Sequence, residues 1–272
     1  MIKVSELSVP QNAHDEWYKT TLLDVASEKI IEKEIQYDYL IIDEFQDLAS
    51  DENLIILDML LVGGLKAGKW HIFGDFEKQI LYQNITDPET ALDRYLGQSV
   101  FSFYLRVNCR NTFNIVKMIE NHISIEPYYQ IIRPDGESTP TQAQYKDDTE
   151  QLANLERNIE NLLKIYEKNE IIILSPKKAG IVNIYNEKNK NKKIERYDFS
   201  LTEQNKSGPY YSTVKSFKGL EYHVVIVVDI SIENFIDLTD MTNQLYTGLS
   251  RALDTTSLHI NEQAIELLSN ER

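Results

Sequence analysis

Short apolar runs and segments of helical periodicity follow one another along most of this chain. Leu40–Ile42 is a short apolar run that predicts a buried strand of a parallel sheet, and Ile171–Leu174 and Val224–Val228 predict two more. Apolar residues recur at helical spacing from Leu152 to Tyr166, which predicts an amphipathic helix facing a core. Ser50 can cap another helix. The pattern therefore predicts parallel strands interspersed with helices.

Other parts of the chain carry a weaker signal. Residues 1–36 are mixed in character and suggest short helices. Residues 136–148 are polar, so we expect a loop there, and Leu258–Ile260 is expected to be a closing strand.

Two adjacent carboxylates, Asp43 and Glu44, follow the run Leu40–Ile42 directly. Ligands of open α/β sheets bind at the carboxyl ends of the strands. One carboxylate of such a pair can hold Mg²⁺, directly or through water, while its neighbour orients or deprotonates an attacking water. Taken by itself, the Asp-Glu pair favours the alternative, a solvated acidic turn after a strand.

Composition narrows the class of protein. The chain has 272 residues, of which 42% are hydrophobic and 26% charged, as expected for a soluble globular protein of one large or two modest domains. We expect no membrane span and no signal peptide. The single cysteine, Cys109, excludes an intrachain disulfide and a cysteine-based zinc site. A cytoplasmic protein is the simplest interpretation.

Charge bears on nucleic-acid binding. The formal net charge of −15 argues against a protein that wraps DNA with a general basic surface, but it leaves room for a narrow basic groove. A basic run is formed by Lys188, Lys190, Lys192, Lys193 and Arg196. A solvated loop is the favoured interpretation of that run, and a nucleic-acid contact is the alternative.

The acidic pair belongs to a longer string, Asp43-Glu44-Phe45-Gln46-Asp47, which resembles motif II, the Walker B element, of UvrD/Rep-type superfamily-one helicases. Four further segments resemble later motifs of that family in the same order. They are Gly74–Tyr82 for motif III, Leu105–Thr112 for motif IV, Thr213–Glu221 for motif V and Leu245–Ala252 for motif VI. The resemblance covers the chain from about residue 37 to residue 260.

The resemblance implies roles for individual residues toward ATP and Mg²⁺. Asp43 would bind Mg²⁺ and Glu44 would activate water. Gln79, Arg110 and Arg251 would contact the γ-phosphate, with Arg251 acting as an arginine finger. Gly219 and Glu221 would lie near the ribose, and Thr213 and Lys215 would face single-stranded DNA.

The chain departs from the family pattern at several of these motifs. One extra residue precedes Gln79, Cys109 stands where the family has Tyr, and Asn111 stands where it has Ser. Lys215 replaces the usual His, so base stacking by that His is lost, although Lys can still meet a phosphate.

The segment Gly63–Lys69 matches the spacing of a Walker A loop. A phosphate-binding loop needs a strand before it and a helix after it. Here the predicted order is helix and then strand, and Trp70 occupies the position of the hydroxyl that would bind Mg²⁺. We therefore predict a helix–turn–strand connection without a phosphate site, and no Walker A loop precedes Asp43 in this sequence.

By this resemblance the fold class is α/β, with RecA-like parallel sheets flanked by helices. We expect an incomplete first motor lobe over 1–102 and a complete second lobe over 103–272. The implied function is that of the C-terminal part of an ATP-dependent DNA helicase, active once a segment of the same longer chain or a partner protein supplies Walker A. A non-catalytic, truncated helicase-like module that binds a partner protein is the alternative. In either case we expect an apolar sheet edge beside Leu40–Ile42 to be exposed.

Overall fold

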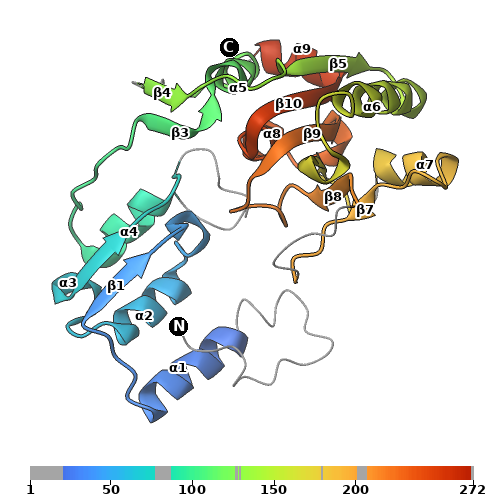
Figure 1. Cartoon of the computed structure of the whole chain (residues 1–272). Coiled ribbons are helices and arrows are strands. Elements are labelled where there is room, and N and C mark those ends of the chain that lie inside the picture. Colours follow the sequence, from blue (N-terminus) through green and yellow to red (C-terminus); the bar gives the residue numbers. More distant parts are fainter. Residues whose placement is uncertain are drawn as a thin grey trace. The chain divides into compact units, whose positions relative to one another are not determined.

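The computed structural model describes residues 21–76, 87–125, 128, 130–178, 180–200 and 207–270. The chain divides into two compact units, Met1–Ser102 and Phe103–Arg272, which are described one at a time (Figure 1). Their assignment as an incomplete and a complete motor lobe stays a prediction. Within the described residues, every helix is too short or too polar to cross a membrane.

The described residues of the first unit form a small parallel sheet and four α-helices. Its elements are α1 (Leu22–Glu32), β1 (Tyr39–Ile42), α2 (Asp51–Leu60), α3 (Gly64–Ala67), β2 (Lys69–Ile72) and α4 (Pro88–Leu96). The helix expected after Ser50 is confirmed as α2, and the Ser50 side chain accepts a hydrogen bond from the Asn53 amide. Strands β1 and β2 pair in parallel, with Ile41 opposite His71.

Only one face of the β1–β2 sheet is covered among the described residues. Leu40 and Ile42 point into a core that includes Phe45 and Leu54. Ile41, on the opposite face, is 72% exposed. The prediction of a fully buried strand is therefore wrong for β1, because a two-stranded sheet with helices on one side leaves alternate side chains in solvent.

The structure confirms the interpretation of Gly63–Lys69 as a plain connection. Gly63 and Gly64 both have positive φ angles, +85° and +63°, which glycine adopts at little cost. The four-residue helix α3 follows, and Lys69 is already the first residue of β2. No strand–loop–helix unit is formed by these residues, so they do not build a phosphate-binding loop.

The second unit has a large parallel sheet. The strands of the unit are β3 (Val107–Thr112), β4 (Gln130–Arg133), β5 (Thr141–Tyr145), β6 (Ile171–Ser175), β7 (Glu195–Arg196), β8 (Tyr210–Thr213), β9 (Tyr222–Ile230) and β10 (Ala252–Asn261). Of these, β3 and β4 pair with each other in a separate two-stranded parallel sheet. Its helices are α5 (Phe113–Glu120), α6 (Asp148–Leu162), α7 (Ile181–Lys188), α8 (Leu238–Leu249) and α9 (Glu262–Asn270). Six strands form one sheet in the order β5-β10-β9-β6-β8-β7, and every pairing is parallel.

Helices cover both faces of this six-stranded sheet. Helices α5, α8 and α9 pack on one face with Ile172, Val225 and Leu258, and α6 and α7 pack on the other with Ile173 and Ile226 (Figure 1). Strands buried on both sides explain the continuous apolar runs in the sequence. The predicted fold class, α/β with parallel sheets flanked by helices, is confirmed.

One prediction about the second unit was wrong and another was right. Residues 136–148 are not all loop, because β5 lies within them as a polar edge strand exposed along much of its length. The strand expected at Leu258–Ile260 is confirmed as part of β10, which lies between β5 and β9 in the sheet. Strand order depends on long crossovers that local sequence does not report.

Candidate functional site

The acidic pair lies where β1 ends. Ile42 is buried as the last residue of the strand, and the chain then turns sharply, with Glu44 in the left-handed region at φ 53°. Asp43 is exposed, and its Oδ1 accepts a hydrogen bond from the Glu44 amide at 2.9 Å. Phe45, fully buried, anchors the turn in the core of the first unit. The fold therefore presents both carboxylates at the carboxyl end of a parallel strand.

Gln46 links this turn to the end of β2. Its side chain is fully buried, its Nε2 donates to Glu44 Oε2 at 2.6 Å, and its Oε1 accepts from the Asp75 amide at 3.2 Å. A Cβ on Gly74 would lie only 2.5 Å from Gln46 Oε1, so this close approach requires glycine. Sequence reasoning assigned no role to Gln46, although its place inside the Asp43–Asp47 string was a usable signal.

The first unit thus fits part of a Mg²⁺ and water site. Carboxylate oxygens are the ligands that Mg²⁺ prefers, and Asp43 is exposed at the strand end where such an ion would be reached. Glu44 is held in place by Gln46. Gln79, the predicted phosphate sensor, lies outside the described residues.

In the second unit, the residues predicted to meet the nucleotide come together from distant segments. Arg110 is in β3 and Glu221 precedes β9, yet Arg110 Nε lies 3.1 Å from Glu221 Oε2. Both side chains are partly exposed. Gly219, two residues before Glu221, has φ +84° and is exposed, which suits a tight turn that brings the chain into β9.

Arg251 is buried rather than extended into solvent. Only 1% of this residue is exposed, its Nε donates to the Thr247 carbonyl at 3.1 Å, and its second terminal nitrogen donates to Ser250 Oγ at 3.1 Å. The Leu220 carbonyl also accepts from the guanidinium, at 3.4 Å. To act as an arginine finger, the side chain would have to leave these acceptors, so that role stays a prediction.

Two asparagines hold the Arg110 and Arg251 segments together. Asn108 Oδ1 accepts from the amides of Arg110 and Asn111, at 3.0 and 2.8 Å. Asn111 Nδ2 donates to the carbonyls of Ser250 and Ala252, the residues on either side of Arg251. Motifs IV and VI, far apart in the sequence, are therefore joined by one buried side chain.

The predicted DNA-facing residues lie at the end of β8. Thr213 Oγ1 accepts from the Ser216 amide at 3.1 Å and donates to Ser216 Oγ at 2.8 Å, which shapes the turn after the strand. Lys215 is exposed, and its Nζ lies 3.9 Å from Asp240 Oδ1 in α8. A carboxylate at this distance competes with a DNA phosphate for the lysine.

The clustered residues of the second unit lie at the amino ends of two central strands. Glu221 precedes β9 and Arg251 precedes β10. At the opposite edge, between β6 and β9, Asp229 accepts from Ser175 Oγ at 2.6 Å and from the amide of Ile181, the first residue of α7. Burial raises the pKa of Asp229. The carboxyl-edge crevice, where ligands bind in many α/β sheets, is thus occupied by the protein itself.

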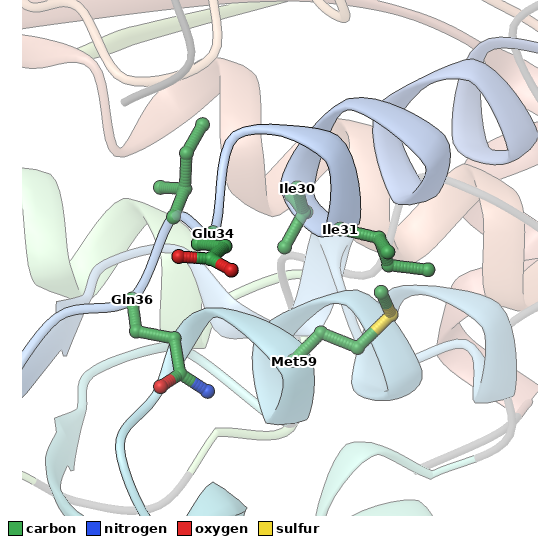
Figure 2. Close-up of a pocket in the computed structure, with 6 residues that line it drawn as sticks. Ile30, Ile31, Glu34, Gln36 and Met59 are labelled. Carbon is green, nitrogen blue, oxygen red and sulfur yellow. The ribbon is translucent and has the colours of Figure 1, made fainter.

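A shallow hollow in the first unit lies between the end of α1 and helix α2 (Figure 2). Its lining residues are Ile30, Ile31, Glu34, Ile35, Gln36 and Met59. None of the residues singled out from the sequence lines it, and we assign it no function.

Comparison with protein families matches the part of the chain that contains most of the candidate site residues of the second unit. Residues 209–257 match the UvrD-like helicase C-terminal domain. The match includes Thr213, Lys215, Gly219, Glu221 and Arg251, whereas Asp43, Glu44, Gln79 and Arg110 lie outside it. The resemblance to UvrD-type helicases is confirmed for this C-terminal part, which is helicase-related.

Among solved structures, the chain is similar to the C-terminal domain of a possible DNA helicase from Lactobacillus plantarum WCFS1. The two share 16% sequence identity with a TM-score of 0.46, over 59% of this chain and 92% of that one. A comparison with curated proteins found no match.

Proposed function

We propose that this chain is the C-terminal part of a cytoplasmic, ATP-dependent DNA translocase of the UvrD/Rep type, which couples ATP hydrolysis to movement on single-stranded DNA. The observation that carries the proposal is the convergence in the second unit. Arg110 forms an ion pair with Glu221, and its neighbour Asn111 donates to the two carbonyls on either side of Arg251, so segments of three separate motifs meet. A shared nucleotide contact is a reason for three distant segments to meet.

The proposal gives each residue a role, and the surroundings of Asp43 and Glu44 support theirs. Asp43 would hold Mg²⁺, which neutralises phosphate charge when bound. Glu44, fixed by Gln46, would accept a proton from the attacking water. Arg110 and Arg251, with Gln79, would contact the γ-phosphate, because a guanidinium stays charged and presents forked donors.

The same proposal assigns DNA contacts to Thr213 and Lys215. Few cations at this surface mean weak, salt-sensitive and sequence-indifferent binding to single strands. The acidic neighbour Asp240 weakens that binding further.

Hydrolysis requires a Walker A loop from another segment, either of the same longer chain or of a partner protein. A P-loop supplies the N–H groups and the lysine that hold the β- and γ-phosphates. In this sequence the segment with that spacing, Gly63–Lys69, forms a helix–turn–strand connection instead.

Steady-state ATP hydrolysis in the presence of single-stranded DNA tests the proposal. We expect the chain alone to turn over far more slowly than the ~1–100 s⁻¹ of typical phosphoryl-transfer enzymes. Adding a Walker A-bearing segment, sought in the coding sequence upstream of Met1 and among co-purifying proteins, should restore DNA-stimulated hydrolysis. Fast turnover by the chain alone would contradict our interpretation of Gly63–Lys69.

A non-catalytic module that acts by binding a partner protein is the second candidate. The face of the β1–β2 sheet that no described residue covers favours it, because Tyr39, Ile41, His71 and Phe73 are all exposed there. Under this alternative the added segment would bind to the chain and stabilise it, but no hydrolysis would follow.

A further inference from the structure

The side chain of Asn111 brackets Arg251. Asn111 is only 3% exposed, and its Nδ2 donates to the Ser250 carbonyl at 3.0 Å and to the Ala252 carbonyl at 2.8 Å. These are the two carbonyls on either side of the Arg251 residue. One amide group therefore uses both of its N–H donors on the backbone that carries Arg251.

The carbonyl of Arg251 itself is also fixed. It accepts a hydrogen bond from the Tyr222 amide, at the start of β9, at 2.9 Å. Three successive carbonyls, those of residues 250–252, are thus held by groups outside their own segment. The backbone under Arg251 is pinned between β3 and β9.

The other end of this connection reaches Arg110. Asn111 directly follows Arg110, and both of their amides donate to Asn108 Oδ1. A shift of Asn111 would therefore move the Arg110 backbone and release the Arg251 backbone together.

The two donors explain why asparagine suits this position. A serine hydroxyl offers one donor and could bond only one of the two carbonyls. An aspartate has the shape of asparagine but, when ionised, only acceptors, so it would set a negative charge against two carbonyl oxygens and leave them unpaired.

We propose that Asn111 is a positioning residue that sets the spacing of Arg110 and Arg251 for a common phosphate. This inference rests on the proposed function, because a shared phosphate is what gives the spacing a purpose. Asn111 itself touches neither substrate nor metal in this proposal and acts through the backbone of the two arginines.

Hydrogen exchange measured by NMR on the chain as it exists tests the positioning without any activity. The reporter is the Tyr222 amide, which is bonded to the Arg251 carbonyl, and the reference is the Val225 amide in the centre of β9. In Asn111→Asp we expect exchange at Tyr222 to speed up by on the order of tenfold more than at Val225. If Asn111→Asp does not fold, Asn111→Ser should show the same selective change at a smaller size, because one donor remains.

Asn186 provides a matched control in the same unit. Its Nδ2 donates to the Ile194 carbonyl at 2.9 Å and its Oδ1 accepts from the Ile194 amide at 2.8 Å. Asn186→Asp removes the same kind of donor, so it should lower stability without a selective change at Tyr222. If Tyr222 and Val225 respond alike in the folded Asn111 variant, as they should in the control, Asn111 is merely structural and the inference is overturned.

A second measurement separates this inference from the proposed function. In the motor completed with a Walker A segment, Asn111→Asp should lower kcat by about tenfold while KM for ATP changes little. Misplaced arginines stabilise the transition state less, whereas they affect the binding of ATP in the ground state little. Unchanged kcat alongside faster Tyr222 exchange would overturn the catalytic purpose of the spacing. If the unmodified completed motor hydrolyses no ATP, the proposed function fails, while the exchange result still decides the positioning.

Discussion

The two parallel sheets of this protein differ in how they are covered. Ile41 in β1 and Ile173 in β6 are both the third residue of a parallel strand, yet Ile41 is 72% exposed and Ile173 is fully buried. Parallel strands are normally covered on both faces, as in the second unit. A continuous apolar run suits a strand that is buried on both faces. Strand β1 has such a run although one of its faces is exposed among the described residues, so its sequence fits a larger, better covered sheet than the two described strands form.

The candidate site residues of the two units also differ in where their partners come from. In the first unit Asp43 and Glu44 have hydrogen-bond partners within their own turn, whereas in the second unit Arg110, Lys215 and Arg251 have partners from other segments. The second unit is preassembled by its own contacts. We infer that completion of the first unit, and displacement of partners in the second, are the two changes that ATP-dependent function would require.

The largest effect is expected at Glu44. In the completed motor, Glu44→Gln should abolish hydrolysis, a loss of roughly 10²–10⁴-fold or more, because the proton acceptor for water is removed. ATP binding, measured by filter retention of labelled nucleotide, should be nearly unchanged, since phosphate contacts remain.

Asp47→Asn is the matched control for this prediction. It removes a carboxylate from the same turn but from a residue to which the resemblance gives no role. If Glu44→Gln hydrolyses ATP as fast as Asp47→Asn, the role assigned to Glu44 is wrong. The first unit would then not supply the group that activates water.

Much of this comparison was accessible from the sequence. The strands of the second unit and the cap at Ser50 follow from apolar runs and turn chemistry, and the motif strings located Asp43, Glu44, Arg110 and Arg251. What local sequence could not give is which side chains meet. The roles of Gln46 and Asn111 arise from contacts between distant segments, and the exposure of Ile41 depends on the number of neighbouring strands.

The burial of Arg251 was also out of reach. A motif places an arginine at the end of a helix, but one of the acceptors that hold it, the Leu220 carbonyl, comes from a segment that only the folded chain brings near. In the same way, Asp240 could not be recognised as the neighbour of Lys215.

Because the two sheets are covered differently, the same Ile→Ala substitution should lower the free energy of unfolding by different amounts in the two units. Ile173→Ala should destabilise the second unit by about 2–5 kcal/mol, because it leaves a cavity in a packed core. Ile41→Ala should change the stability of the first unit by less than ~0.5 kcal/mol, as for other surface sites.

Urea unfolding can follow the two units separately. Both tryptophans lie in the sequence of the first unit, and Trp70, in β2, packs against its core, so tryptophan fluorescence follows the first unit, while far-UV circular dichroism includes the second. A loss above ~2 kcal/mol for Ile41→Ala in the isolated chain would mean that the face around Ile41 is already covered, and the comparison would break down.

Acid should weaken the second unit through His259. This histidine is fully buried in β10, and burial lowers its pKa from 6.5 to about 4. Between these values the unfolded chain takes up a proton that the folded chain does not, so stability falls as pH drops from 6.5 toward 4 and the loss is complete below 4. The loss amounts to about 3 kcal/mol, since one pKa unit corresponds to about 1.4 kcal/mol.

Urea unfolding of the unmodified chain and of His259→Leu, each at pH 7.5 and pH 4.5, checks this expectation. Asp229, whose pKa is raised by burial, acts in the opposite sense in both proteins and cancels in the difference. The variant should lose less stability on acidification than the unmodified chain. Equal losses in the two proteins would show that His259 is not the group responsible.

The smallest effect concerns DNA and the partners already present in the second unit. Lys215 Nζ lies 3.9 Å from the buried carboxylate of Asp240, so a DNA phosphate must compete with that carboxylate. Asp240→Asn should therefore tighten binding of a labelled single strand by about two- to fivefold in low salt, and Lys215→Ala should weaken it by a similar factor, as expected for one partly exposed charge.

Asp237→Asn removes an equal charge from the start of α8 while keeping a side chain that can cap the helix, so it controls for net charge alone. Fluorescence anisotropy gives both affinities. Both aspartate substitutions remove one negative charge, but only Asp240→Asn removes the local partner of Lys215. If Asp237→Asn increases the affinity for DNA as much as Asp240→Asn does, Lys215 is not part of the DNA-binding surface. The residues clustered in the second unit would then have no nucleic-acid role.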